Sequence, residues 1–278
     1  MGGKHISDDL TSAPRAEHDP AWPPPPPDWR HDAPDPPDAF PVPWTWGDGL
    51  ALVLWSVLAQ FVVVVVVEGA GGAGGDTDLL VAAGASQILT LLGAIAYLRL
   101  RGVLSWRLLG PLRPRWRQVL GGIAAGVSGW IITVLMLLVA LRLTRTEELP
   151  SQETLEHIVS GATAAFVLGV VLAVLLAPLV EELIYRAVFF QALRARLGVF
   201  PAMGISSLLW AAMHVEFILS SSGEFEVAGL VPMAVLAIFG LWLAAAFHRG
   251  GSLVVPLVGH AAFNGIQLGL VLLAPNVV

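Results

Sequence analysis

The chain alternates between long apolar stretches and short polar connections. An α-helix needs about 20 mostly apolar residues to cross a bilayer. Seven stretches meet this requirement, with predicted bounds Leu50–Val67, Leu79–Leu98, Val119–Leu141, Thr163–Phe190, Phe200–Ser220, Ala228–Phe247 and Leu253–Ala274. The fourth stretch is long enough for two helices, or for one helix that runs past the membrane surface. The pattern predicts an all-α polytopic membrane helical bundle of about seven to eight transmembrane helices.

Composition supports this class and excludes several others. Hydrophobic residues make up 56% of the chain and charged residues 13%, whereas a soluble domain carries about 25% charge. The absence of cysteine excludes disulfides, a thiolate nucleophile and cysteine-based zinc sites. The net charge of -6 does not favour a nucleic-acid partner. The strong preference for Arg over Lys is typical of a GC-rich bacterial genome, so we expect a bacterial plasma-membrane protein whose surroundings are the lipid bilayer.

The first 46 residues differ from the rest of the chain. They contain a run of five prolines, Pro23 to Pro27, and little apolar sequence. This composition predicts a disordered tail of polyproline II character before a transmembrane helical domain over residues 47–278. A solvated tail is the simpler interpretation, and a docking segment for a proline-recognising partner is the alternative. Trp44 and Trp46 fit an aromatic belt at the membrane surface.

The distribution of arginine between loops predicts the orientation of the chain. Arginine gathers in alternate loops, namely those holding Arg99, Arg101, Arg107, Arg113, Arg115, Arg117, Arg194, Arg196 and Arg249. The loop over residues 69–78 has no basic residue, and neither does the loop over residues 221–227. Because loops rich in Lys and Arg stay on the cytoplasmic side, we expect the N-terminus to be cytoplasmic.

A few ionisable and amide side chains lie inside the predicted spans. Such groups cost about 2.5–3.5 kcal/mol each when they enter a membrane, so they are usually functional. They are Glu181, Glu182, Arg186, His214, His260 and Asn264. Depth can be measured from the predicted cytoplasmic end of each span at about 1.5 Å per residue. Glu181, His214 and Asn264 then lie about 18–21 Å deep, and His260 lies about 12 Å deep. The depths overlap, so these residues can meet if the three spans pack together.

Spacing divides the candidates into two kinds. Glu182 and Arg186 are four residues apart, which favours an ion pair on one helix and leaves Glu181 less constrained. His260 and Asn264 are also one turn apart, and two donors on one face are what an oxyanion hole requires. Each feature alone also fits a structural role: a buried histidine, an ion pair or helix–helix contact. Together they favour one site.

Three motifs in this region resemble a known family. Glu181-Glu182-x-x-x-Arg186, Trp210-x-x-x-His214 and His260-x-x-x-Asn264 are similar to the motifs of the CAAX-protease and bacteriocin-processing (CPBP) intramembrane proteases. The resemblance implies a protease-like core over about residues 158–278. Two departures are visible, since Trp210 stands where phenylalanine is usual and Tyr185-Arg186-Ala187 replaces the frequent Phe-Arg-Gly.

The resemblance implies a role for each residue. Glu181 activates the attacking water, His214 helps to hold it, and His260 and Asn264 stabilise the oxyanion. Glu182 and Arg186 support them. A buried glutamate suits a general base that later acts as an acid, so no cofactor is favoured. The alternative is a divalent metal such as zinc on Glu181, His214 and His260, because two His and one Glu form a known ligand set.

The expected activity is that of an intramembrane endopeptidase acting on a membrane-associated peptide or protein. Two other functions use the same residues. A proton- or ion-coupled transporter would use them as a relay, although no inverted repeat is visible. A non-catalytic immunity or partner protein would keep the scaffold without the reaction.

Overall fold

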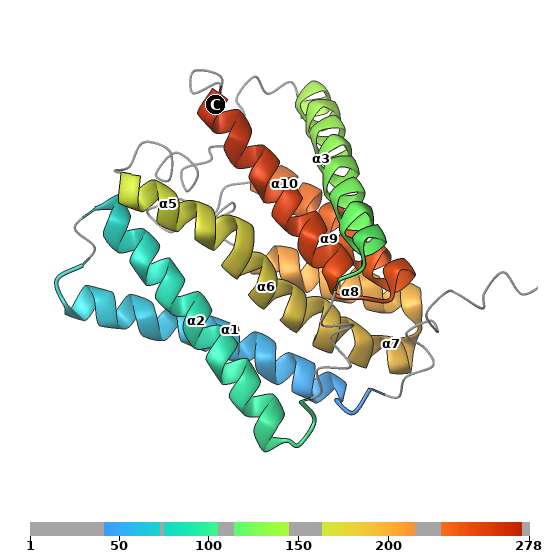
Figure 1. Cartoon of the computed structure of the whole chain (residues 1–278), viewed down its shortest axis with the longest axis horizontal. Coiled ribbons are helices and arrows are strands. Elements are labelled where there is room, and N and C mark those ends of the chain that lie inside the picture. Colours follow the sequence, from blue (N-terminus) through green and yellow to red (C-terminus); the bar gives the residue numbers. More distant parts are fainter. Residues whose placement is uncertain (1–41, 73–74, 105–113, 145–162, 215–228, 274–278) are drawn as a thin grey trace, which may run out of the picture. The chain divides into compact units, whose positions relative to one another are not determined.

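The computed structural model describes residues 42–72, 75–104, 114–144, 163–214 and 229–273 (Figure 1). All of them belong to one compact unit, Asp35–Val278. Every regular element in these ranges is a helix, which confirms the all-α prediction. The elements are α1 (Trp46–Gly69), α2 (Asp76–Leu100), α3 (Trp116–Thr144), α5 (Thr163–Val171), η3 (Leu172–Leu176), α6 (Ala177–Glu181), η4 (Glu182–Phe190), α7 (Gln191–Leu197), α8 (Val199–Ala212), α9 (Leu230–Gly250) and α10 (Val254–Leu273).

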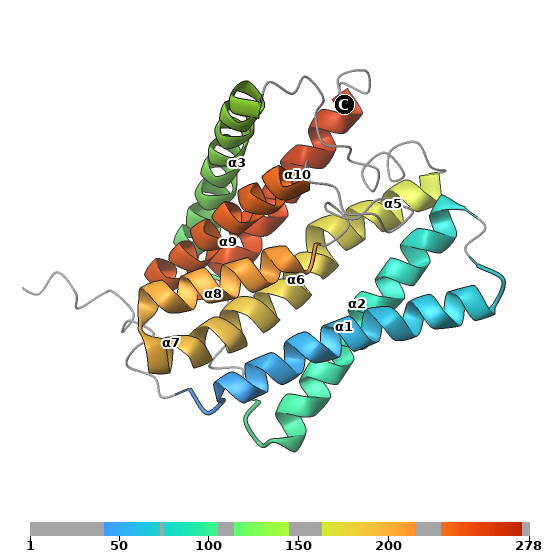
Figure 2. The same ribbon diagram turned by 180° about the vertical axis from the view of Figure 1, so that it is seen from behind.

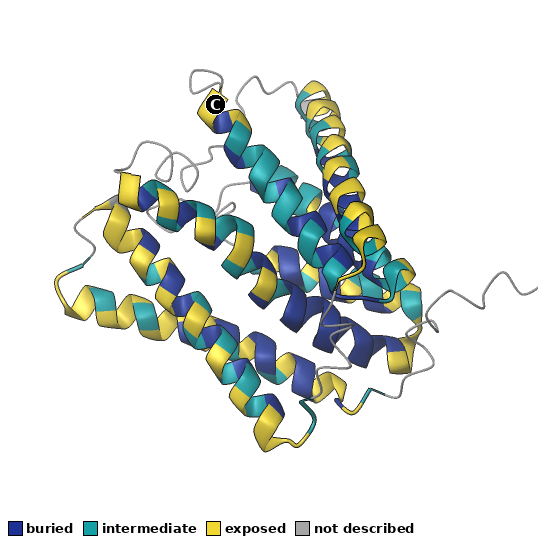
Figure 3. Ribbon diagram, viewed as in Figure 1, coloured by how far each residue is buried: buried dark blue, intermediate teal, exposed yellow. Residues whose placement is uncertain are grey.

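Within the described residues, six helical segments are long and apolar enough to cross a membrane, and α8 is a shorter apolar helix. Together they account for the seven predicted spans. The fifth prediction extended to Ser220, but α8 ends at Ala212, and residues 215–220 lie outside the described residues. Large apolar side chains are exposed along α1 and α3, as a lipid-facing surface requires (Figure 3). The predicted membrane bundle is therefore confirmed in class and approximately in helix number.

The fourth span is one continuous helical path of 35 residues, Thr163–Leu197. At about 1.5 Å per residue it is about 50 Å long, well beyond the roughly 30 Å hydrocarbon core. Two π-helical segments, η3 and η4, interrupt its α-helical geometry. The path lies between α1 and α2 on one side and α8, α9 and α10 on the other (Figures 1 and 2). All nine residues of η4 are buried, so this segment forms the centre of the bundle.

Glycine allows two other helices to approach closely. A Cβ atom on Gly126 of α3 would lie 2.4 Å from the carbonyl oxygen of Gly259 on α10, and one on Gly122 would lie 2.6 Å from Val258. Gly122 and Gly126 form the small-residue spacing that brings membrane helices together. Of all pairs of elements, α3 and α10 have the most extensive contact. This contact positions α10, which carries His260 and Asn264.

Residues just before the predicted boundary at residue 46 pack against the core of the bundle. Residues 1–41 of the expected tail lie outside the described residues. Trp44 is only 4% exposed and belongs to the same core cluster as Val180 and Ile184, so it does not contribute to a surface belt. Trp46 is 46% exposed, consistent with the predicted belt. Trp44 reaches the core because Gly49, one turn farther on, lets the start of α1 lie against Phe189.

A polar cluster then fixes the start of α1 to the end of α2. Thr45 and Asp48 form a capping box at the N-terminus of α1. The second carboxylate oxygen of Asp48 accepts hydrogen bonds from Tyr97 Oη at 2.7 Å and from Arg101 Nε at 2.9 Å. Asp48 is buried, and these donors offset the loss of its hydration.

Candidate functional site

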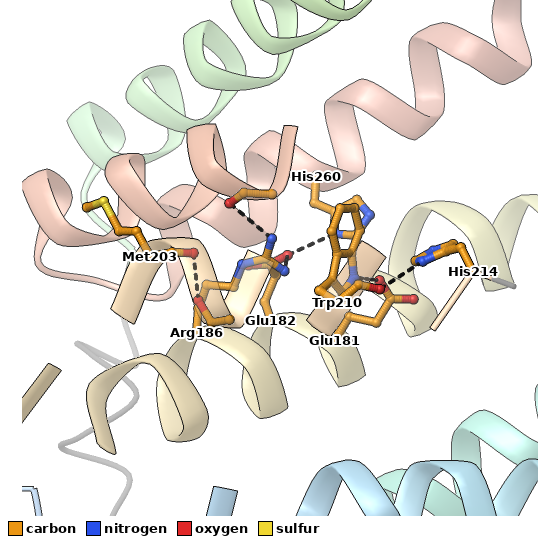
Figure 4. Close-up of polar contacts among 9 residues, drawn as sticks. Glu181, Glu182, Arg186, Met203, Trp210, His214 and His260 are labelled. Atoms are coloured by element: carbon orange, nitrogen blue, oxygen red, sulfur yellow. Dashed lines mark hydrogen bonds and ion pairs between the residues drawn. The ribbon is translucent and has the colours of Figure 1, made fainter. Parts of the chain in front are cut away.

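Glu182 is the centre of a buried ionic network (Figure 4). Its Oε1 lies 2.9 Å from Arg186 NH1 and 2.9 Å from His260 Nδ1. The three residues are 0%, 1% and 4% exposed, respectively. The predicted Glu182–Arg186 ion pair is present, and the contact with His260 connects it to α10. A carboxylate only accepts hydrogen bonds, so Nδ1 of His260 must donate and its Nε2 points elsewhere.

The backbone of α9 supplies a second partner for Arg186. Arg186 NH2 donates to the carbonyl oxygen of Gly240 at 3.3 Å. A Cβ atom on Gly240 would lie 3.0 Å from Ser207 and 3.0 Å from Trp210, both on α8. The glycine therefore allows α8 and α9 to approach closely at the depth where the guanidinium group is held.

Glu181 ends α6 and its environment differs from that of its neighbour Glu182. Glu181 is half-buried, and its Oε2 accepts a hydrogen bond of 2.5 Å from the indole Nε1 of Trp210. Trp210 also contacts the other network: the Arg186 guanidinium lies over its ring at 4.8 Å, and the His260 ring meets it edge-on at 5.5 Å. Trp210 thus joins the half-buried carboxylate to the buried ionic network.

His214 lies two residues after the end of α8 at Ala212 and is half-buried. Its Nδ1 lies 3.0 Å from the carbonyl oxygen of Trp210, and the two rings meet at a centroid distance of 5.0 Å. A carbonyl oxygen only accepts, so Nδ1 donates and a neutral imidazole keeps Nε2 as an acceptor. The helix was expected to include His214, but it ends at Ala212.

Asn264 lies one turn after His260 on α10 and is anchored to η3. Its Nδ2 donates to the carbonyl oxygen of Ala173 at 2.7 Å. This carbonyl is free to accept because the N–H of Ala177 bonds to Leu172, and residue 178 is a proline without an N–H. The π-helical turn and the proline together provide an acceptor for the amide.

Five of the six predicted residues therefore connect through Trp210 and Glu182: Glu181, Glu182, Arg186, His214 and His260 (Figure 4). Asn264 shares a helix with His260 but is attached separately to η3. Among the described residues, no three His, Cys, Asp or Glu side chains are placed to hold a metal ion. The proposed ligand set of Glu181, His214 and His260 is thus not gathered around one point in these residues.

Sequence reasoning missed several groups that form this site. Trp210 was noted as the first residue of the Trp210-x-x-x-His214 motif and as a departure from the family pattern, but no role was predicted for its indole, which contacts most of the site. The carbonyl oxygens of Gly240 and Ala173 could not be recognised in the sequence. Every residue has the same backbone carbonyl, so the sequence does not show which carbonyls accept hydrogen bonds from side chains. Pro178 inside an apolar span was the available signal for an unpaired carbonyl one turn earlier.

Part of the chain is similar to known CAAX endopeptidases. Residues 163–266 match the family described as "Type II CAAX prenyl endopeptidase Rce1-like". The resemblance to the CAAX proteases is confirmed. In addition, 96 residues are 30% identical to CAAX prenyl protease 2 of Homo sapiens, which is 32% of this chain and 29% of the human protein. No solved structure matches the chain.

The CAAX endopeptidase-like region extends from α5 into α10 and contains all six predicted site residues. Helices α1, α2 and α3 lie before it. The chain as a whole matches less than a third of the length of its human relative. The apolar helices and the family together identify an integral membrane protein.

Proposed function

We propose that this chain is an intramembrane endopeptidase that uses Glu181 to activate water. The observation that carries the proposal is the contrast between two adjacent carboxylates. Each carboxylate has one engaged oxygen, Oε1 of Glu182 with Arg186 and His260 and Oε2 of Glu181 with Trp210, but Glu182 is fully buried, whereas Glu181 is half-buried and its Oε1 can be reached. A general base must reach both water and substrate, so the lesser burial of Glu181 supports it in this role.

The proposed reaction needs only water and a peptide. Glu181 takes one proton from water while the water oxygen attacks the peptide carbonyl carbon, which forms a tetrahedral oxyanion. The C–N bond then breaks, and the leaving nitrogen receives the proton from Glu181. The products are a carboxylic acid and an amine. His214 directs Nδ1 to the Trp210 carbonyl, so in the proposed reaction Nε2 of the neutral imidazole accepts the second hydrogen of the water.

Oxyanion stabilisation places a condition on His260. Its Nδ1 proton is directed at Glu182, so Nε2 can donate to an oxyanion only when the ring is an imidazolium. The Glu182 carboxylate orients the ring, as a carboxylate orients a catalytic histidine in other hydrolases. Asn264 donates one Nδ2 hydrogen to the Ala173 carbonyl, and its second Nδ2 hydrogen is the one that would donate to the oxyanion.

The proposed substrate is a membrane-associated peptide or a segment of a membrane protein. The human relative is named a CAAX prenyl protease, so a prenylated CAAX peptide is a suitable first probe. A hydrophobic precursor peptide without a prenyl group is the second probe, because the host is expected to be bacterial. Both present an apolar group that holds the scissile bond near the bilayer.

The proposal is tested by cleavage of these peptides in proteoliposomes. Glu181→Gln removes the base while keeping the side chain's size, so we expect cleavage to fall by about 10²–10⁴-fold. Glu68→Gln makes the same change at an exposed position of α1 and should leave cleavage unchanged. Normal cleavage by the Glu181→Gln variant would contradict the proposal. Flux that depends on a pH gradient and is lost in that variant would instead support the transporter.

A further inference from the structure

We infer that Trp210 is a positioning residue: its indole N–H positions Glu181, and its backbone carbonyl positions His214. The inference rests on the proposed function of Glu181 and extends it to a residue whose side chain takes no part in the chemistry. The hydrogen bond of 2.5 Å from Nε1 to Glu181 Oε2 is its starting point.

The indole is held firmly enough to act as a fixed donor. Trp210 is only 1% exposed. The Arg186 guanidinium lies over its ring, and His260 and Phe239 contact it at centroid distances of 5.5 and 6.1 Å. The α-carbon of Gly240 approaches it so closely that an added Cβ would lie 3.0 Å from Cε3. An indole packed on several sides cannot change rotamer, so its N–H keeps one direction.

Glu181 needs such a donor more than its neighbour does. Glu181 is the last residue of α6 and is half-buried, and no ion pair to it is found among the described residues. A glutamate that is free at one end samples several side-chain rotamers. Binding Oε2 to the indole selects one of them and leaves Oε1 for the water. The hydrogen bond is charge-assisted, which makes it stronger than a neutral one.

The backbone of the same residue positions the second group. The carbonyl oxygen of Trp210 accepts the Nδ1 proton of His214. The indole therefore holds the proposed base while the carbonyl holds the proposed water-binding imidazole. One residue sets the separation between them, and a base misplaced by about 1 Å can lose about 100-fold in rate.

Trp210→Phe separates these two contributions. It removes the N–H but keeps an aromatic ring and the backbone carbonyl, so His214 stays attached. We expect kcat to fall about 10- to 100-fold with KM changed by less than about twofold, because positioning of the base affects the chemical step. Trp242→Phe is the matched control, since the Trp242 indole donates to the Ala125 carbonyl at 3.0 Å, outside the site. That variant should keep the wild-type kcat.

A second variant guards against an effect of ring size. Benzothienylalanine at position 210 keeps the shape of tryptophan and replaces the N–H with sulfur, so it should reproduce the loss of kcat. If both position-210 variants keep the wild-type kcat while Glu181→Gln is inactive, the inference about Trp210 is wrong and the proposed function of Glu181 still stands. Full cleavage by Glu181→Gln would overturn the proposed function beneath it. An increase in KM without a change in kcat would also contradict positioning.

Discussion

At the scale of single residues, the Glu182–Arg186 pair shows how a charge can be kept inside an apolar helix. Both side chains are almost fully buried, and their ion pair is 2.9 Å long. Burying two charges costs several kcal/mol each, so the pair adds little to stability. Removing one partner is different, because the other is then left buried without a counter-ion.

Glu182→Ala should therefore destabilise the protein strongly. We expect the free energy of unfolding to fall by about 3–5 kcal/mol. It can be measured by titration with SDS in mixed micelles, with helix content as the signal. A double variant, Glu182→Met with Arg186→Leu, removes both charges and should regain most of the stability.

The double variant also separates stability from catalysis. His260 loses its acceptor in both variants, so cleavage should remain low even where stability returns. A Glu182→Ala variant as stable as the wild type would contradict the importance of the buried pair.

At the scale of elements, α3 supports the site although it lies outside the family match. It contacts α10 through Gly122 and Gly126, and α10 carries His260. A side chain at residue 126 must push the two helices apart, because the atom it meets is the backbone oxygen of Gly259. The displacement of Gly259 would also move His260, which is the next residue of α10.

Gly126→Val should reduce both stability and cleavage. Overpacking of this kind costs about 1–3 kcal/mol of unfolding free energy, and a shift of about 1 Å at the site can cost about 100-fold in rate. Gly121→Val is the matched control on the same helix, since a Cβ atom there has no neighbour within 4 Å. Equal behaviour of the two variants in SDS titration and cleavage assays would show that this contact does not position α10.

At the scale of the whole molecule, loop charge predicts the orientation in the membrane, and this prediction can be measured directly. The chain has no cysteine, so each single-cysteine variant carries one label site. Ala70→Cys at the end of α1 and Arg196→Cys on α7 lie at exposed positions of loops predicted on opposite sides.

A membrane-impermeant maleimide should label Ala70→Cys in intact spheroplasts, and label Arg196→Cys only after lysis. This result would place the N-terminus in the cytoplasm, as the arginine-rich loops predict. The reverse pattern would invert the orientation. Labelling of both before lysis would show that the two loops share one side. Cleavage activity of each variant serves as the control for folding.

Much of the architecture could be read from local pattern. The membrane spans follow from runs of apolar residues, because lipid excludes backbone that is not hydrogen-bonded within its own segment. The ion pair of Glu182 and Arg186 follows from helical spacing. The fourth span was predicted with two alternatives, and one continuous helix of 35 residues is present.

Other features depend on neighbours that are distant in the chain. Trp44 fitted a surface belt by position, but it is buried because the η4 helix provides a matching core. His214 was expected within a helix, yet it follows the end of α8. Neither outcome is visible in a sequence window, since burial and helix ends depend on tertiary packing.

The class of the molecule, its approximate spans and the residues worth testing can be predicted from the amino-acid sequence, because they depend on hydrophobicity and on spacing along one helix. The difference between the two adjacent glutamates depends instead on the packing of distant helices. Glu182 turns to His260, 78 positions later, and Glu181 to Trp210, 29 positions later. Adjacent residues on a helix point about 100° apart, so the packed helices, rather than the local sequence, choose the partner of each carboxylate.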